Sequence, residues 1–486
     1  MHTVESGRLK LRWAALLVLP LALLYRYIAS EEQAVVVTLR DLGLAFLLTY
    51  LWERLNKRRA TFFIVNGILV MAIALGWYLL SFAYSAFNNL LGEKQREPTV
   101  STVQYLLELG PDDSIDEVVP WLKEAGASYT KIFTTVSLQE DENLAQYFLI
   151  NCPADKGEKL AKLLGADKEN VDSYEPNYQR WQVPVLEAHA VSKEQEHLTN
   201  DPFVSQQWAL KSIQLSFDKL RALKPIRKAR IAIIDTGVDK DHEDLEESFC
   251  PSPGSFDENG HGTHCAGIAG AVANNKLGIA SLNWEGKFIE IMSFPALDAK
   301  GRGSVESVAS AIIEAVQAGA DVISLSLGGW HPKPPKAEVD AIHFALRKGC
   351  LVVVAAGNNS EAAIEFSPAN VPGVIVVTAL NEKNELAPFS NTVEGIPYAV
   401  AAPGVNILSL KPGNGYVALS GTSMATPLVA GILGVFKSIN PSIQQKEAYE
   451  ILAASSSWEQ TETNRSGKII NMDKILDFLN KNKNIN

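Results

Sequence analysis

Cysteine is scarce in this chain, with four residues among 486, and their positions exclude the common structural metal sites. Cys152, Cys250, Cys265 and Cys350 are widely separated and fit neither a CxxC pair nor a Cys/His zinc spacing. One pair could form a disulfide outside the cytosol. We interpret all four as buried free thiols.

An excess of positive charge is also lacking. The chain has 44 Lys and Arg against 55 Asp and Glu, a formal net charge of −11, and no basic stripe beyond the first 60 residues. Because phosphate binding needs a basic face, nucleic acid is excluded as a partner. The length and the 47% hydrophobic content instead predict two or three folded units.

Charge is absent altogether from residues 60–92, near the N-terminus. This stretch contains an apolar run longer than the about 20 residues that a bilayer core needs. Two weaker runs precede it, one of them interrupted by Arg40 and Asp41. We predict a membrane anchor over residues 1–95, with the lipid bilayer as its partner. Its three expected transmembrane helices cover residues 13–28, 33–52 and 62–87.

The charges that flank these runs predict an orientation. Basic residues precede the first run and separate the second from the third, whereas Glu31 and Glu32 lie between the first and second. Positive loops stay in the cytoplasm, so everything after Gly92 is expected on the non-cytoplasmic side. A cleaved signal peptide alone would not explain three apolar runs.

Residues 99–180 change periodicity repeatedly and predict a small α+β domain. The order β-α-β-β-α-β is the ferredoxin-like arrangement. The polar stretch from Arg180 to Asn200 predicts an exposed linker, which we place at residues 181–200. The expected strands are 103–109, 128–138, 146–152 and 170–178, and the expected helices are 114–125 and 156–164.

Residues 201–486 alternate short apolar strands with helical stretches. IAIID before Thr236, VISLSLGG after Asp321 and LVVVAAGN after Cys350 are typical of buried strands. The alternation predicts an α/β fold with a doubly wound parallel sheet and helices on both faces. The ligand site of such a sheet lies at the carboxyl ends of the strands, where Asp235 is expected.

Three motifs follow one another in this domain. Asp235 lies in DTGVDKDHEDL, His261 in NGHGTHCAG and Ser423 in GTSMATP. In this order they resemble the active-site signatures of the subtilisin family (subtilases, peptidase S8), and DPFVSQQWAL from Asp201 resembles the mature N-terminal region of these proteases. The resemblance implies a subtilisin-like fold and a serine endopeptidase that cleaves proteins or peptides with an Asp-His-Ser triad. No cofactor is required for that chemistry.

The residue types suit these roles. A serine hydroxyl is a poor nucleophile unless a base takes its proton; the resemblance assigns that base to His261, oriented by Asp235. The backbone N–H of Ser423, at a predicted helix start, can face the developing oxyanion. Asn358 in AAGNN resembles the family's second oxyanion donor. The segments that resemble the substrate-binding walls are Ser326, Leu327 and Gly328, and Ala355, Ala356 and Gly357.

The small domain and its SYEPNY ending resemble the inhibitory propeptide of subtilisins. The resemblance implies that it assists folding, places its tail in the active site and is removed by self-cleavage within Arg180–Asn200. The chain is then a membrane-anchored zymogen. Because the anchor is joined to the protease only through this domain, cleavage could release the enzyme.

A structural calcium ion is a further implication of the resemblance. Asp244 matches a calcium-binding aspartate of subtilisins, and ANNKLGI resembles the loop that supplies the Asn275 amide and the carbonyls of Leu277 and Ile279. Oxygen ligands of this mixture suit Ca²⁺. The gap from His261 to this loop is one residue longer than the family pattern. Phe366 is a second departure from the family pattern. It occupies a position where the family often has a small residue at the base of the S1 pocket.

Other readings of the same residues are less favoured. An aspartic protease needs two aspartates that share a proton, and the sequence has no second Asp-Thr/Ser-Gly. We interpret His264 as a core histidine, Cys265 as a buried thiol, and Asp257 and Glu258 as solvated loop carboxylates. Two alternatives stay open: an inactive membrane scaffold with a protease fold, and a regulated protease with one dedicated substrate.

Overall fold

The computed structural model describes residues 102–182, 186–188, 199–254, 256–456 and 463–481. The chain divides into two units, Met1–Val100 and Ser101–Asn486, and every described residue belongs to the second. The predicted membrane anchor therefore lies outside the described residues, and its three spans stay a prediction.

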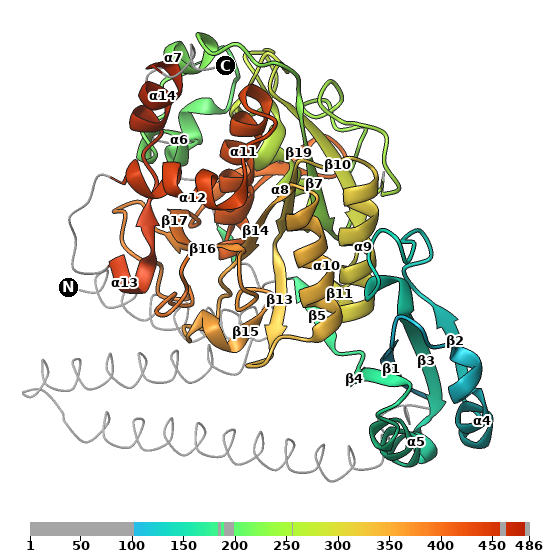
Figure 1. Ribbon diagram of the computed structural model, residues 1–486. Helices are drawn as coiled ribbons and strands as arrows, with labels where there is room; N and C mark the ends of the chain where they lie inside the picture. Colours follow the sequence, from blue (N-terminus) through green and yellow to red (C-terminus); the bar gives the residue numbers. More distant parts are fainter. Residues whose placement is uncertain (1–101, 183–185, 189–198, 255, 457–462, 482–486) are drawn as a thin grey trace, which may run out of the picture. The chain divides into compact units, whose positions relative to one another are not determined.

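The first folded part is a small antiparallel sheet with two helices (Figure 1). The strand order is β2-β3-β1-β4, which is that of the predicted ferredoxin-like arrangement. Leu107 of the sheet shares one buried cluster with Leu122 and Leu160 of the two helices. The elements are β1 (Thr102–Leu109), α4 (Ile115–Ala125), β2 (Ser128–Lys131), β3 (Tyr147–Pro153), α5 (Ala154–Ala166) and β4 (Val171–Pro176).

One predicted strand of this part is much shorter than expected. The strand expected over residues 128–138 ends at Lys131. Beyond it, Phe133 and Val136 are buried in a cluster that also contains Ile312 and Ile342 of the larger domain. The alternation of apolar residues therefore reflects packing between the two domains and not a continued strand.

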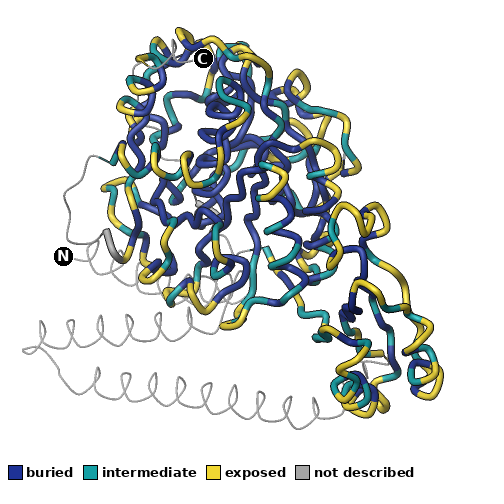
Figure 2. Tube along the Cα trace, viewed as in Figure 1, coloured by how far each residue is buried: buried dark blue, intermediate teal, exposed yellow. Residues whose placement is uncertain are grey.

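Seven parallel strands form the central sheet of the larger domain. Their residues are almost all buried, as Figure 2 shows, because helices cover both faces. The sheet confirms the predicted parallel α/β architecture. In spatial order the strands are β10 (Ile289–Pro295), β7 (Ala229–Asp235), β12 (Val322–Leu325), β14 (Leu351–Ala355), β16 (Ile375–Leu380), β17 (Ala399–Pro403) and β20 (Lys468–Ile469).

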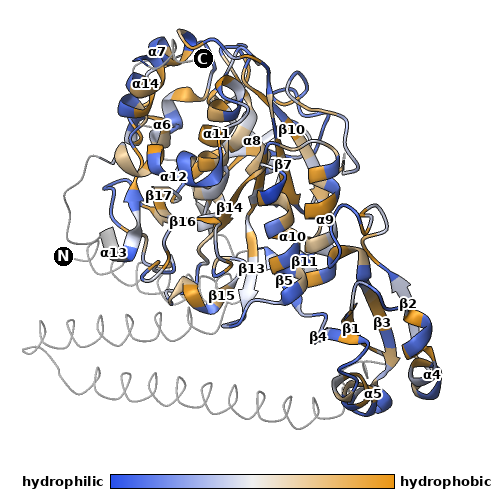
Figure 3. Ribbon diagram, viewed as in Figure 1, coloured by the Kyte–Doolittle hydropathy of each residue, from blue (hydrophilic) through white to orange (hydrophobic). Residues whose placement is uncertain are grey.

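Alternate residues of each strand enter the two cores on either side of the sheet. In β7, Ile231 and Ile233 join the core that contains α8 (His261–Gly270) and α11 (Thr422–Ile439). Ala232 and Ile234 join the core that contains α9 (Val305–Gln317) and α10 (Lys336–Arg347). Figure 3 shows the strands as the hydrophobic centre of this domain. Because β10 and β12 flank β7, the order of strands reverses at β7, the point where such sheets place their ligands.

The helix α11 is buried along almost its whole length. Among the residues that the structure describes, it is the one helix long and apolar enough to cross a bilayer, yet 94% of that window is buried inside the protein. Its first turn carries Ser423. We interpret α11 as the central core helix of the larger domain.

Two short strands of the predicted linker join sheets of the larger domain. β5 (Gln179–Gln182) lies between β11 (Arg302–Ser304) and β13 (Leu327–Trp330), antiparallel to both. β6 (Leu186–Ala188) pairs with β19 (Gly415–Ser420). The exposed linker expected from Arg180 onward is therefore wrong for its first residues, because the side chain of Arg180 is 1% exposed.

The remaining elements are short or peripheral. They are η1 (Leu144–Gln146), η2 (Val204–Gln206), α6 (Trp208–Ser212), α7 (Phe217–Arg221), β8 (Val272–Ala273), β9 (Asn283–Trp284), η3 (Ala363–Glu365), β15 (Phe366–Ser367), β18 (Ile407–Lys411), α12 (Gln445–Ala454), α13 (Thr463–Ser466) and α14 (Met472–Lys481).

Candidate active site

The ends of two neighbouring elements bring Asp235 and His261 together. Asp235 is the last residue of β7 and His261 the first of α8. Nδ1 of His261 lies 2.8 Å from Oδ1 and 2.9 Å from Oδ2 of Asp235. Because a carboxylate can only accept, Nδ1 carries the proton and Nε2 is the basic nitrogen of the ring. Nε2 is buried and has no hydrogen-bond partner among the described residues.

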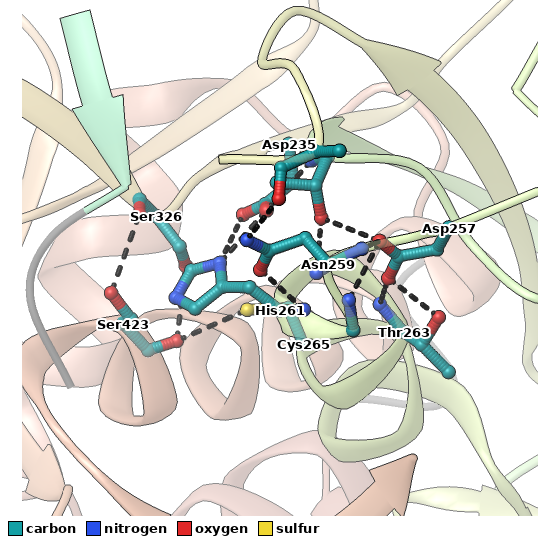
Figure 4. A network of polar contacts seen from close by, with 12 residues as sticks. Asp235, Asp257, Asn259, His261, Thr263, Cys265, Ser326 and Ser423 are labelled. Atoms are coloured by element: carbon teal, nitrogen blue, oxygen red, sulfur yellow. Dashed lines mark hydrogen bonds and ion pairs between the residues drawn. The ribbon is translucent and has the colours of Figure 1, made fainter. Parts of the chain in front are cut away.

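Ser423 lies on the other side of the same imidazole. Figure 4 shows the ring of His261 between Asp235 and Ser423. Oγ of Ser423 donates to the carbonyl of Ser326 at 3.3 Å, and Oγ of Ser326 donates back to the carbonyl of Ser423 at 3.0 Å. The three residues predicted as a triad are thus neighbours, although their motifs are far apart in the sequence.

A fourth side chain, Asp257, holds the start of α8 in place. Its Oδ1 accepts from Oγ1 of Thr236 and from the backbone N–H groups of Asn259 and Gly260, and its Oδ2 accepts from N–H and Oγ1 of Thr263. Figure 4 shows this network beside the Asp235–His261 pair. The prediction that Asp257 is a solvated loop carboxylate is therefore wrong, since the residue is 3% exposed.

Close packing next to His261 explains a glycine in the HGTH motif. A Cβ at Gly262 would lie 2.1 Å from the carbonyl oxygen of Gly237. The N–H of Gly262 donates to Oγ1 of Thr236, which ties α8 to the residue after Asp235. The strand end and the helix start are consequently one hydrogen-bonded unit.

Two opposing effects act on the pKa of His261. Burial lowers it, but the charge and hydrogen bond of Asp235, together with the charge of Asp257, more than offset burial, so the pKa is raised above its ordinary value. The neighbouring His264 has no such partner, and burial lowers its pKa to about 3. His264 is 0% exposed, which confirms its interpretation as a core histidine.

Asn358 follows the end of β14 and contacts Thr422, the first residue of α11. Its Oδ1 accepts from the N–H of Thr422 at 2.9 Å and from Oγ1 of Thr422 at 3.0 Å. Oδ1 is therefore the accepting end that anchors the amide beside Ser423. Nδ2 is the end of the amide that can donate to a substrate oxygen.

The sequence of this chain matches a known protein family. A model of the family described as "Subtilase family" matches residues 227–471, which is half of the chain. The chain belongs to the subtilase family. The prediction of a subtilisin-like serine protease is thereby confirmed at the level of the family.

Individual relatives agree with this assignment. The chain is 39% identical to thermitase of Thermoactinomyces vulgaris over 267 residues, 52% of this chain and 89% of thermitase. It is 43% identical to a thermophilic serine proteinase of Bacillus sp. (strain AK1) over 216 residues, 43% of this chain but only 52% of that relative. Fervidolysin from Fervidobacterium pennivorans shares the fold, with a TM-score of 0.65 and 23% identity over 79% of this chain and 62% of fervidolysin.

The predicted substrate-binding segments of this subtilase lie around Ser423. Ser326 connects β12 to β13, and Leu327 and Gly328 pair through β13 with Gln182 and Trp181 of β5. The structure thus places an extended strand of the same chain along this segment. The roles of these residues in substrate binding stay a prediction.

The second predicted segment follows the carboxyl end of β14. Ala355 ends the strand, the N–H of Ala356 donates to the carbonyl of Val377, and the N–H of Gly357 donates to Oγ1 of Thr422. Gly357 has a φ of 104°, and a Cβ there would lie 2.4 Å from Nδ2 of Asn391, so only glycine fits. Phe366 is buried in β15, and its predicted place at the base of S1 stays a prediction.

The predicted calcium ligands of this subtilase are brought together, but their contacts do not fit a cation. Oδ1 of Asp244 accepts from Nδ2 of Asn275, and Oδ2 accepts from the N–H of Ile279. Oδ1 of Asn275 accepts from the N–H of Leu277. A calcium site presents oxygen atoms to the ion, whereas here N–H donors face the carboxylate. Burial raises the pKa of Asp244 to about 6, although these hydrogen bonds partly oppose the shift.

All four cysteines are free thiols, as predicted, and Cys152, Cys265 and Cys350 are buried; Cys250 is only half-buried, so the prediction of burial is wrong for that residue. Cys265 lies in α8, and its Sγ donates to the carbonyl of Ser423 at 3.5 Å. Burial raises the pKa of the Cys265 thiol well above its ordinary value. A thiol that stays protonated is a poor nucleophile. Cys265 therefore contributes to the packing of α8 and is not a nucleophile.

Proposed function

We propose that this subtilase is a serine endopeptidase that hydrolyses peptide bonds of extended polypeptide segments through an acyl-enzyme. The observation that carries the proposal is the buried pair of Nδ1 of His261 and the Asp235 carboxylate, with Ser423 on the far side of the ring. This arrangement leaves one basic nitrogen facing one alcohol.

The reaction follows from these positions. Oγ of Ser423 turns from the Ser326 carbonyl towards Nε2 of His261 and attacks the substrate carbonyl as Nε2 takes its proton. The N–H of Ser423 and Nδ2 of Asn358 donate to the oxyanion. The imidazolium, stabilised by Asp235, then gives the proton to the leaving amine. A water molecule repeats the sequence against the acyl-enzyme and releases the new carboxylate.

We further propose that residues 102–182 are an intramolecular inhibitor, so that the chain is made as a zymogen. β5 supports this proposal, because it pairs with β13, which begins directly after Ser326, the residue that contacts Ser423. β6, just beyond residue 182, pairs with β19, which ends three residues before Ser423. Adding a strand to an exposed edge is a common way to bind an extended peptide. The match to fervidolysin also covers more of the chain than residues 201–486 can supply.

Hydrogen bonds and an ion pair between the small sheet and α10 also support docking of this inhibitor. Nζ of Lys336 in α10 donates to Oε1 of Glu108 in β1 at 2.6 Å. The hydroxyl of Tyr147 in β3 donates to Asp340 of α10 at 2.7 Å. The N–H groups at the start of α10 donate to the carboxylate of Glu175, where the helix dipole also favours negative charge.

The apolar runs of residues 1–95 support a multi-pass membrane anchor, with the protease on the non-cytoplasmic side and released if self-cleavage occurs within residues 181–200. Phosphatase and fluorescent reporters fused after Gly92 test the orientation, and a cytoplasmic signal would refute it. Immunoblots of membrane and soluble fractions test release. Full-length, membrane-bound protein alone would contradict it.

The hydrolase is tested with the full chain in detergent beside its Ser423→Ala variant. We expect self-processing and labelling by a fluorophosphonate in the unchanged chain and neither in the variant. Intact, unlabelled chain in both samples would favour an inactive scaffold with a protease fold. Labelling without cleavage of general protein substrates would favour a protease with one dedicated substrate.

A further inference from the structure

A buried ion pair joins the inhibitor-like strand β5 to the larger domain. Nε of Arg180 donates to Oε1 of Glu338 at 2.9 Å, and Nη2 donates to Oε2 at 2.8 Å. The two side chains are 1% and 0% exposed. Oγ of Ser367 also donates to Oε2 of Glu338. The carboxylate is therefore built into the larger domain, whereas its cationic partner comes from a segment that the proposed processing would remove.

The strand register shows which substrate position Arg180 occupies. Leu327 is opposite Gln182 and Gly328 is opposite Trp181 in the antiparallel pairing of β13 with β5. Ser326, one residue before Leu327, contacts Ser423. A substrate strand in this register places the residue of its scissile carbonyl opposite Ser326. Counting back from that residue as P1, Gln182 stands at P2, Trp181 at P3 and Arg180 at P4.

The alternation of the strand agrees with this count. Successive side chains of a strand point to opposite sides. Trp181 is 46% exposed, whereas Arg180 is buried against α10. A P3 side chain would therefore face solvent, and a P4 side chain would enter the space in front of Glu338.

From these contacts we propose that Glu338 makes the protease selective for substrates with arginine at P4. The inference rests on the proposed endopeptidase function and names a specificity determinant of that same site. A buried carboxylate without a cation is strongly unfavourable, and departure of β5 would leave Glu338 with Ser367 as its remaining side-chain partner in the described network. A planar guanidinium can restore both hydrogen bonds at once, which a neutral or apolar side chain cannot do.

The ion pair could instead serve only to fasten the inhibitor to the protease. In that case, substitution of Glu338 would weaken docking of β5 but leave the choice of peptide substrate unchanged. The two roles are separated by a control on the same helix. Asp340 contacts Tyr147 and Lys336 and lies outside the β5 register. Asp340→Asn should weaken docking of the small domain without altering P4 selectivity.

The test uses the full chain after self-processing and fluorogenic peptides that differ only at P4, with arginine, citrulline, lysine or leucine. Citrulline keeps the shape of arginine without its charge. We expect kcat/KM for arginine to exceed that for citrulline by roughly 10²-fold. Glu338→Gln should bring the two peptides within a few-fold of each other, and Asp340→Asn should retain the preference.

Titration with a fluorophosphonate distinguishes a failure of the proposed hydrolase from a failure of the P4 inference. Absence of labelling in the unchanged chain would refute the hydrolase itself. A labelled enzyme that cleaves the arginine and citrulline peptides equally well would overturn the P4 inference and leave the hydrolase intact. If Glu338→Gln yields no labelled enzyme, the profile of the unchanged chain and of Asp340→Asn still decides the question.

Discussion

Replacing Asp257 by alanine tests whether its hydrogen bonds stabilise the fold around the Asp235–His261 pair. The carboxylate accepts five hydrogen bonds, and Thr236 and Thr263, two of its partners, are themselves buried. A hydrogen bond to a charged group contributes about 1.5–3 kcal/mol, and buried donors left without an acceptor add to the loss. Because the donors adjust and the contributions are not additive, we expect the free energy of unfolding to fall by about 3–5 kcal/mol.

The variant is measured in the Ser423→Ala background, which prevents self-digestion during thermal unfolding. Glu258→Ala is the matched control, because Glu258 is the neighbouring carboxylate and is exposed. We expect Asp257→Ala to lower Tm by several degrees and the control to leave it unchanged. Equal Tm values for the two variants would refute the idea that Asp257 holds the strand end and the helix start together.

The same substitution shifts the pH dependence of activity. The charge of Asp257 contributes to raising the pKa of His261. Since the general base must be neutral, kcat/KM increases as the pH rises through that pKa. Loss of the negative charge lowers the pKa, so the acidic limb of the profile should move to lower pH. A limb that stays in place or moves to higher pH contradicts this electrostatic assignment.

Three further predictions use the same protein. Asn358→Ala should lower kcat by about 10²–10³, the size known for loss of the equivalent donor in subtilisin, and a decrease confined to KM would argue against an oxyanion role. A chelator should leave the Tm unchanged, because N–H donors face Asp244; a clear decrease in Tm would show a bound cation after all. Arg180→Ala leaves the buried Glu338 without its cationic partner, so in the Ser423→Ala background residues 102–182 should become markedly easier to digest with an added protease. Trp181→Ala changes an exposed neighbour and should have little effect.

The sequence allowed the triad to be predicted because each of its members lies at the end or the start of a regular element. The apolar run before Asp235 predicts a buried strand, and parallel strands bring such ends together at one edge of the sheet. The motifs around His261 and Ser423 predict helix starts, and both residues do lie in the first turn of a helix. Local pattern and tertiary position agree at these three residues.

Asp257 and Glu338 could not be recognised from the sequence, for a common physical reason. A carboxylate in a polar loop or on an amphipathic helix is most often solvated, and its burial depends on partners distant in the chain. Asp257 does have a weak local signal, because it precedes a helix start by a few residues, where acceptors for free N–H groups are favoured. Glu338 has none, since its partner Arg180 lies 158 residues earlier.

The linker assignment was wrong for β5 for a related reason. Gln179–Gln182 has one aromatic residue, Trp181, among three polar ones, so its pattern does not predict a strand. The strand forms because β11 and β13 offer unpaired backbone groups on both sides. Pairing of this kind depends on the edges that receive the strand, which the local sequence of the strand does not reveal.

The position of the proposed nucleophile on α11 governs how the enzyme can lose activity. This helix runs through the core, and all of its residues from Thr422 to Ser438 are buried. Ser423 therefore cannot be displaced by fraying of a surface loop; the core itself must open first. Heat should accordingly abolish catalysis and cooperative structure in one step, with no intermediate that is folded but inert.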